Sequence, residues 1–283
     1  MQTHPFFKDI LLHSDDELAE ALGVGISERA TLHEWPLSCV QRLLLEDGRK
    51  LIYKSQLPPT VEPQFYAAAS SPLLPGHQNL GKLGNCEIMT IDWIDAPLLR
   101  DAAYSGGALI EHGKRVIAQI DEISGDLPVY LDIGSAEAWS AVGQTMFDKL
   151  VTLVRDKRFT SIDLDAVERV RAWTRSDSAI AAITKHPRVT HGDLTAEQVF
   201  VTADGYRVID WQRPLVAPPE VDLVALLIGQ HIDPRRFMDA TLVGIFWFLR
   251  LNWVVEAQFD LFPDKRWPLF DQWAMEAVSQ ILG

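Results

Sequence analysis

Apolar and polar residues alternate along the first third of the chain. The alternation predicts strands over Cys39–Leu45, Lys50–Lys54 and Glu87–Ile91. An Asp-Gly pair between the first two runs is typical of a hairpin turn. Helical spacing predicts a short helix over Asp15–Leu22 and a second over Val61–Ala69, which lies between the second and third strands. This part of the chain is therefore expected to be strand-rich.

After about residue 97 the apolar residues recur at helical spacing. The predicted helices are Ala108–Ile123, Glu137–Val154, Asp165–Ile183, Val221–Ile228, Phe237–Gln258 and a last one from Pro268 to the end. Two short β-like runs, Val199–Val201 and Arg207–Ile209, interrupt this pattern. Strands followed by helices indicate the α+β class, in two lobes. We expect a strand-rich domain over 1–95 and a helical domain over 96–283.

The composition narrows the range of partners. The chain has 283 residues, of which 47% are hydrophobic, and this is enough for a large core. It carries 26 basic and 39 acidic side chains, for a formal net charge of −13. Such a charge argues against nucleic acid or an anionic membrane as the main partner. It permits a cationic substrate without requiring one.

Nothing in the sequence indicates a disulfide framework or a membrane anchor. Cys39 and Cys86 are isolated, which fits neither a disulfide scaffold nor a zinc site. Met1–Ile10 lacks the basic and apolar regions of a signal peptide. The most apolar stretch, Ala240–Val255, is short for a membrane span and contains an arginine and an asparagine, so it predicts a buried helix. We therefore expect a cytoplasmic protein.

Candidate chemistry is concentrated in the segment that interrupts the helices. Asp193 follows a His-Gly pair, Gln198 comes five residues later, and Asp210 follows the β-like hairpin. Phosphoryl transfer to a hydroxyl needs a carboxylate that accepts the hydroxyl proton and oxygen ligands that hold Mg²⁺ on the phosphates. These three side chains supply that set.

The segment resembles the signature of the aminoglycoside phosphotransferase family and of the related choline, homoserine and fructosamine kinases. That signature is His-Gly-Asp, four variable residues, Asn, a hairpin, and Ile-Asp-Trp or Ile-Asp-Phe. In this chain the two motifs are His191-Gly192-Asp193 and Ile209-Asp210-Trp211. The resemblance implies a two-lobed protein-kinase-like fold, Mg²⁺ and ATP as cofactors with GTP left open, and a hydroxyl of a small molecule as acceptor. It implies that Asp193 is the catalytic base and that Asp210 is a magnesium ligand.

The chain departs from the family at Gln198, which stands where the family has Asn. Glutamine also offers a carbonyl oxygen, but its extra methylene moves that oxygen by about 1.3 Å, one covalent bond length. Either Gln198 still serves the metal, or the protein is a catalytically impaired, nucleotide-binding pseudokinase. The resemblance implies that His191 supports the catalytic loop and that Asp222 ties the following helix to it.

The same resemblance implies a nucleotide site in the first third of the chain. Lys54 is the expected strand lysine for the phosphates, and Glu62 is its expected helix partner. A phosphate-covering loop is expected over His33–Cys39, which has no glycine but offers the Ser38 hydroxyl. The hinge that binds the adenine edge is expected at Ile91, Asp92, Trp93 and Ile94.

The acceptor is expected to bind among the C-terminal helices. Acidic residues lie near tryptophans there, a combination that suits a cationic acceptor. The candidates, all weak, are Glu220, Asn252, Glu256, Asp260, Asp264 and Asp271. An antibiotic-type kinase and a metabolic kinase for a choline-like, amino-acid or sugar alcohol both remain open, as do a monomer and a dimer.

Overall fold

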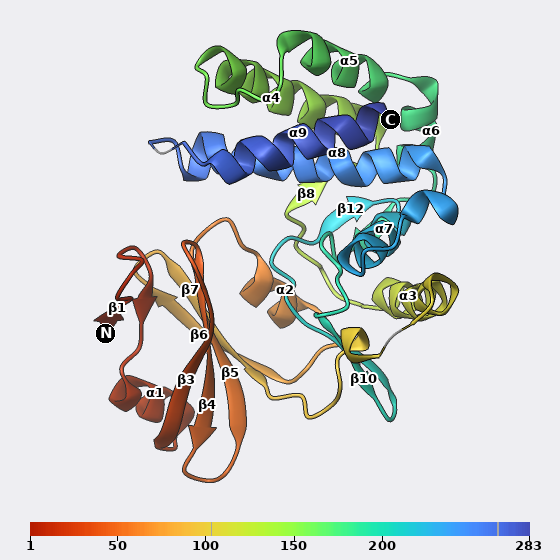
Figure 1. Ribbon diagram of the computed structural model, residues 1–283. Helices are drawn as coiled ribbons and strands as arrows, with labels where there is room; N and C mark the ends of the chain where they lie inside the picture. Colours follow the sequence, from red (N-terminus) through yellow and green to blue (C-terminus); the bar gives the residue numbers. More distant parts are fainter. Residues whose placement is uncertain (103, 265) are drawn as a thin grey trace. The chain divides into compact units, whose positions relative to one another are not determined.

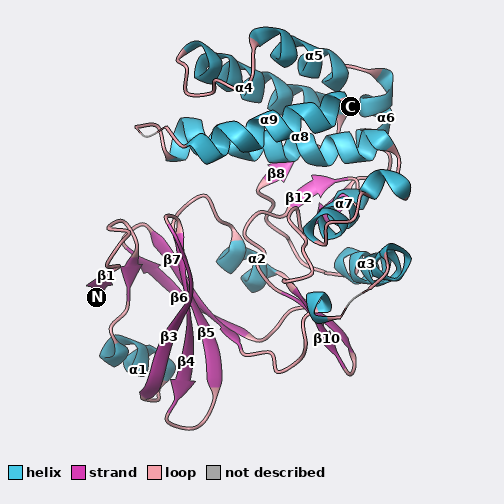
Figure 2. Cartoon of the chain, in the orientation of Figure 1, coloured by secondary structure: helices cyan, strands magenta, loops and turns pink. Residues whose placement is uncertain are grey.

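The computed structural model describes residues 1–102, 104–264 and 266–283. The chain packs as two compact units. Unit 1 comprises Met1–Ala103, Glu122–Tyr130 and Ala196–Pro214, and unit 2 comprises Tyr104–Asp121, Leu131–Thr195 and Leu215–Gly283. An antiparallel sheet early in the chain and helices later on confirm the α+β class (Figures 1 and 2). Each unit combines three separate segments of the chain. The predicted division into lobes at residue 95 stays a prediction.

Unit 1 is built on a five-stranded antiparallel sheet of order β3-β4-β5-β7-β6. Its strands are β3 (Ile26–Trp35), β4 (Ser38–Leu45), β5 (Lys50–Gln56), β6 (His77–Leu83) and β7 (Cys86–Asp92). The smaller elements of the unit are β1 (Gln2–Thr3), β2 (Leu11–Leu12), α1 (Asp15–Leu22), α2 (Glu62–Ala68), the 3₁₀ turn η1 (Leu99–Asp101), β10 (Val199–Thr202) and β11 (Gly205–Val208).

The sequence predicted the inner strands and missed the edges. The predicted strands lie within β4, β5 and β7, and the predicted hairpin is β10–β11. The edge strands β3 and β6 expose most of their side chains and therefore show no apolar alternation. Because β3 extends to Trp35, only a two-residue turn separates it from β4. The phosphate-covering loop expected near His33–Cys39 is thus a tight turn between two strands, and its role in binding phosphate stays a prediction.

The central strand β5 presents different chemistry on its two faces. Successive side chains of a strand point to opposite sides. Leu51 and Tyr53 join the buried apolar cluster that also contains Leu18 of α1. Lys54 and Gln56 instead hydrogen-bond to the first residue of α2. One face of the strand thus builds the core, and the other carries polar groups into the interior.

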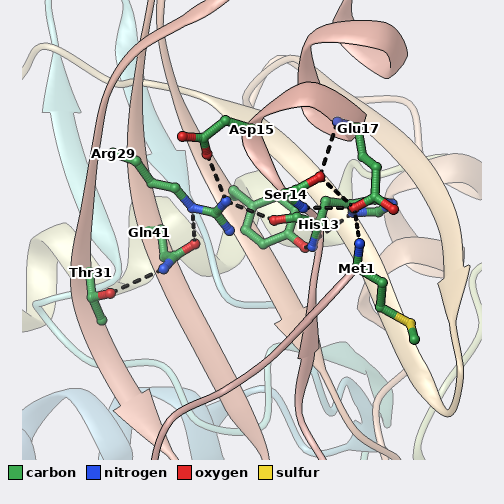
Figure 3. Close-up of polar contacts among 9 residues, drawn as sticks. Met1, His13, Ser14, Asp15, Glu17, Arg29, Thr31 and Gln41 are labelled. Carbon is green, nitrogen blue, oxygen red and sulfur yellow. Dashed lines mark hydrogen bonds and ion pairs between the residues drawn. The ribbon is translucent and has the colours of Figure 1, made fainter.

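A polar network fastens α1 to this sheet (Figure 3). Arg29 of β3 donates to the carboxylate of Asp15 at 3.0 Å and to the side-chain oxygen of Gln41 at 2.6 Å. Ser14 and Glu17 form a capping box in which each side chain accepts from the other's backbone N–H. These contacts fix the start of the helix, so that Leu18 is held over the core cluster.

Unit 2 is predominantly helical and contains one small sheet of order β8-β12-β9. Its helices are α3 (Gly106–Asp121), α4 (Ala136–Arg155), α5 (Leu164–Thr174), α6 (Asp177–Thr184), α7 (Glu220–Gly229), α8 (Ala240–Glu256), the 3₁₀ turn η2 (Pro234–Arg236), a π-helical turn η3 (Ala257–Leu261) and α9 (Pro268–Leu282). Its strands are β8 (Leu131–Asp132), β9 (Arg188–Thr190) and β12 (Leu215–Ala217). Helices α8 and α9 lie side by side (Figure 1).

The single helix predicted over Asp165–Ile183 forms two helices, α5 and α6. The periodicity over Asp165–Ile183 continues across Ser176, but the Ser176 hydroxyl accepts from the Ala179 N–H and starts a new helix, α6. The pair is tied to the rest of the unit by Trp139 of α4. Its indole N–H donates to the Thr174 carbonyl at 2.8 Å, and its ring lies 4.4 Å from that of Phe248 in α8.

Helix α8 is long and largely apolar. Together with η3 it covers Ala240–Leu261, which is long and apolar enough to cross a membrane by length and composition. Within the described residues it is the one such helix, and 61% of its apolar window is buried inside the protein. It packs against α4, α6, α7 and α9, as the central helix of a folded domain does.

The contact between α8 and α5 gives a test of this packing. A methyl group at Gly244 would lie 2.5 Å from the ring of Trp173, whereas one at Gly143 of α4 would make only an ordinary contact with Phe147. We expect Gly244→Ala to destabilise the protein by about 1–3 kcal/mol, because the rigid indole has to move. Gly143→Ala, the control, should stabilise it by up to about 1 kcal/mol. Denaturant unfolding followed by circular dichroism measures both, and equal effects would contradict the packing.

Candidate active site

A buried lysine is the centre of the polar groups in unit 1. Lys54 lies on β5 between Val40 of β4 and Met89 of β7. Its Nζ lies 2.5 Å from Oε2 of Glu62 and 2.8 Å from Oδ1 of Asp210. The prediction that Lys54 pairs with Glu62 agrees with this geometry.

The charges of this group depend on one another. Burial works against the charged form of Lys54, but the carboxylates of Asp210 and Glu62 outweigh it and raise the pKa of the lysine. Burial raises the pKa of Glu62, and the charge of Lys54 opposes that effect. Glu62 also accepts from the side chain of Gln56 at 2.7 Å. The lysine is therefore held as a cation, and it compensates a carboxylate that has no access to water.

Asp210 sits on an unusual backbone. It lies two residues after β11 and has a φ of +75°, in the left-handed region that non-glycine residues rarely adopt. Its carboxylate accepts from Lys54 at 2.8 Å, from the Gln212 amide at 2.8 Å and from the Gln198 amide at 3.2 Å. Backbone strain of this kind is frequent at functional sites and persists where surrounding contacts fix it. The three donors fix it here.

The donor set around Asp210 fits a hard cation. One carboxylate, about one-third exposed, lies beside the side-chain amide of Gln198. Mg²⁺ is usually bound through one or two carboxylates together with substrate phosphates. Across the described residues no cluster of three or more His, Cys, Asp or Glu side chains forms a cation cage.

The predicted hinge borders a cavity. Asp92, Trp93 and Ile94 line a hollow of about 420 Å³ together with residues 95–97 and the β10–β11 turn. This volume lies within the range of about 300–1,000 Å³ typical of small-molecule sites. Ile91 is buried within β7 and does not line it. Ser38, at the start of β4, is also buried.

In unit 2 the segment that leads to Asp193 is held by a buried carboxylate. Asp222, near the start of α7, accepts from the backbone N–H of His191 at 2.8 Å and from that of Gly192 at 2.9 Å. Gly192 has a φ of +84°, which explains the glycine. Burial raises the pKa of Asp222, against the effects of His191 and the two backbone donors. The expected tie between this helix and the loop is thus present.

Asp193, the expected base, lies beside an arginine that sequence reasoning did not single out. Arg250 of α8 donates to its Oδ1 at 3.1 Å. The two side chains line a cavity of about 210 Å³, whose aromatic walls include Trp247, Trp253 and Trp273. Arg250 is 57 residues from Asp193 in sequence. Only its position on a long apolar helix could have drawn attention to it.

The acidic residues proposed for the acceptor lie elsewhere. Asp260 pairs with Lys149, and Asp271 accepts from Thr160 and Ser161 inside the protein. Asp264 is exposed, and Asn252 and Glu256 are half-buried on α8; Glu220 borders a different cavity, next to Asp222. Glu276 of α9 is the acidic residue that joins Asp193 in the tryptophan-lined cavity. Glu220, Glu256, Asp260 and Asp264 remain predictions.

Comparisons with known proteins agree with the fold and with this segment. Residues 134–252 match the model of the phosphotransferase enzyme family. No curated protein sequence matches the chain. Among solved structures, a choline/ethanolamine kinase family protein from Mesorhizobium loti has a TM-score of 0.62 at 15% identity, with 90% of this chain and 87% of that chain covered.

Two antibiotic phosphotransferases are also similar. A spectinomycin phosphotransferase, solved with ADP and spectinomycin, has a TM-score of 0.56 at 14% identity and covers 96% of this chain and 94% of its own. A macrolide 2′-phosphotransferase from Brachybacterium faecium has a TM-score of 0.55 at 14% identity, covering 92% of this chain and 95% of its own. At such identities the likeness shows the fold.

The chain thus has the fold of protein-kinase-like phosphotransferases. Over residues 134–252 the chain matches the phosphotransferase enzyme family, in agreement with the resemblance to aminoglycoside phosphotransferases noted in the sequence.

The buried lysine gives a stability prediction. We expect Lys54→Met to destabilise the protein by about 3–5 kcal/mol at neutral pH, because it leaves the Glu62 carboxylate buried without its cation. A carboxyl whose folded pKa lies above its unfolded value binds its proton more tightly in the folded state, so stability rises as pH falls through that raised pKa. The deficit should therefore be smaller at about pH 5 than at about pH 8.

Thermal and urea unfolding at the two pH values measure this deficit. Lys50→Met, on the same strand but exposed, is the control and should change stability by less than about 0.5 kcal/mol. A deficit for Lys54→Met that does not depend on pH would contradict the pairing with Glu62.

Proposed function

We propose that this protein is a small-molecule kinase that transfers the γ-phosphoryl group of ATP to a hydroxyl of its acceptor. The observation that carries the proposal is the buried Lys54 held between Glu62 and Asp210. A lysine in this position, between a helix glutamate and a metal-binding aspartate, is the phosphate-binding arrangement of protein-kinase-like enzymes. The family match over the segment that contains Asp193 supports the same assignment.

In this proposal unit 1 binds the nucleotide. The Lys54 ammonium neutralises phosphate charge, and Glu62 keeps the ammonium in place. The hinge residues and their cavity hold the adenine end. ADP bound to the spectinomycin phosphotransferase of the same fold supports ATP as donor.

Asp210 and Gln198 would hold Mg²⁺ in the loaded enzyme. When bound, the ion neutralises charge on the phosphate oxygens. Asp210 is accessible, and its carboxylate accepts hydrogen bonds from Lys54, Gln198 and Gln212. A cation would replace hydrogen bonds of this kind, and the backbone would keep its conformation. The longer side chain at Gln198 reaches the carboxylate itself, which supports a role in positioning Asp210 as well as in binding the ion.

Unit 2 supplies the base in this proposal. The acceptor oxygen forms a bond to the γ-phosphorus while the bond from that phosphorus to the β-phosphate oxygen breaks, and ADP leaves. The hydroxyl proton passes to the carboxylate of Asp193. Asp222 holds the loop backbone that carries this carboxylate.

A catalytically impaired nucleotide-binding protein is the second candidate. Its support is Gln198, whose amide nitrogen, rather than its oxygen, faces Asp210. Such a protein would bind nucleotide without turnover.

Nucleotide binding with and without Mg²⁺ tests the first half of the proposal. We expect wild type to bind ATP more tightly when Mg²⁺ is present, and Asp210→Ala to lose that gain, about tenfold or more. Asp210→Ala leaves Lys54 paired with Glu62, so the lysine keeps one of its two carboxylate partners. Gln198→Asn restores the family residue and should retain the gain. Calorimetry measures each affinity, and the absence of nucleotide binding in wild type would remove the kinase assignment.

The role of Asp193 can be tested separately. We expect Asp193→Asn to lower kcat by about 10²–10⁴-fold, since the hydroxyl loses its proton acceptor. The affinity for ATP should stay the same, because Asp193 belongs to the acceptor side of the proposal. Glu197→Gln, an exposed carboxylate in the same loop, is the control and should keep its activity. ADP release measured with a panel of hydroxyl acceptors gives the rates; an unchanged kcat in Asp193→Asn would reject its role as base.

A further inference from the structure

The cavity beside Asp193 combines opposite charges with aromatic walls. It has a volume of about 210 Å³ and lies wholly within unit 2. Its charged residues are Asp193, Arg250 and Glu276, and tryptophans 247, 253 and 273 form much of its wall. Sites for drug-sized ligands are larger, at about 300–1,000 Å³. The cavity therefore suits an acceptor of amino-acid size.

Arg250 presents a difficulty for a base at Asp193. A neighbouring cation stabilises the ionised carboxylate and makes it a weaker proton acceptor. Their single hydrogen bond of 3.1 Å joins two side chains that are 41% and 56% exposed, so the pair is weak and exchangeable. Among the described residues Asp193 is the guanidinium's only hydrogen-bond partner, and a guanidinium has five N–H donors. It can therefore receive a second anion.

The opposite charge is available on α9. Glu276 lines the same cavity as Arg250, and tryptophan faces attract ammonium groups. A ligand with an ammonium group would meet Glu276 and the indoles, and a ligand with a carboxylate would meet Arg250, whose planar fork matches carboxylate geometry.

From this arrangement, and on the basis of the proposed function, we propose that the acceptor is a small hydroxy amino acid. Its carboxylate binds Arg250, its ammonium group binds Glu276 and the tryptophan wall, and its hydroxyl is left for Asp193. Arg250 is then a specificity residue that also tunes the base: once the guanidinium turns to the carboxylate of the acceptor, it stabilises the ionised form of Asp193 less, and Asp193 accepts the hydroxyl proton more readily. An amino alcohol without a carboxylate leaves the Arg250–Asp193 pair in place.

Calorimetry with matched ligands tests this proposal. L-Serine, L-threonine and L-homoserine are titrated into the ATP-analogue-bound protein, each beside the amino alcohol that lacks its carboxylate and the hydroxy acid that lacks its ammonium group. We expect at least one amino acid to bind about 10–100-fold more tightly than both of its analogues.

The variants Arg250→Met and Glu276→Gln separate the two charges. Arg250→Met should lose the affinity for the amino acid but bind the matching amino alcohol as well as wild type does, or better. Glu276→Gln should also lose the affinity for the amino acid, together with that for the amino alcohol, but should bind the hydroxy acid as well as wild type does. General damage to the cavity would weaken all ligands together. Arg236→Met, an exposed arginine on η2, is the control and should leave every affinity unchanged.

Two results overturn the proposal. One is an amino alcohol that binds wild type as tightly as its amino acid, which would indicate a cation-only site. The other is the failure of all three amino acids to bind while the ATP analogue still does, in which case the kinase assignment stands and only the acceptor class falls. Loss of analogue binding itself would count against the proposed function.

Discussion

The structure of unit 1 depends on one buried cation. Lys54 lies on the central strand of the sheet, where almost no water reaches it, and a charge in such a place has to be compensated by its neighbours. Glu62 at the start of α2 and Asp210 after β11 provide that compensation. The need to compensate the Lys54 charge thus holds together a strand, a helix and a hairpin that are distant in sequence.

Unit 2 also contains a buried charge that its neighbours compensate, but there the charge is negative. Asp222 is a buried carboxylate whose compensation comes from backbone N–H groups rather than from a cation. Because those N–H groups belong to His191 and Gly192, satisfying the carboxylate also sets the path of the chain just before Asp193. In both units, ion pairs or hydrogen bonds offset the free-energy cost of burying a charge. The same contacts restrict the conformation of the segment that carries the candidate site residues.

The sequence predicted those features whose signals are local. The inner strands follow from apolar alternation, the helices from apolar spacing, and the pairing of Lys54 with Glu62 from the family pattern. The edge strands β3 and β6 were not predicted because exposed strands have no apolar face. The break between helices at Ser176 was not predicted because the apolar periodicity continues across it. Asp222 was found through the family motif. Arg250 has no such motif, and only the folding of α8 brings it to Asp193.

The net charge of the chain says little about the charge that an acceptor meets. A formal charge of −13 permits a cationic ligand without requiring one, and the acidic candidates were chosen from the sequence because they lie near tryptophans. Most of that charge is spread over exposed side chains, where water and salt screen it beyond about 10 Å. Inside a cavity of about 210 Å³, by contrast, each charge is within a few ångströms of the ligand. The acceptor proposed here therefore follows from the local pattern of Arg250, Glu276 and Asp193 rather than from the net charge of the chain.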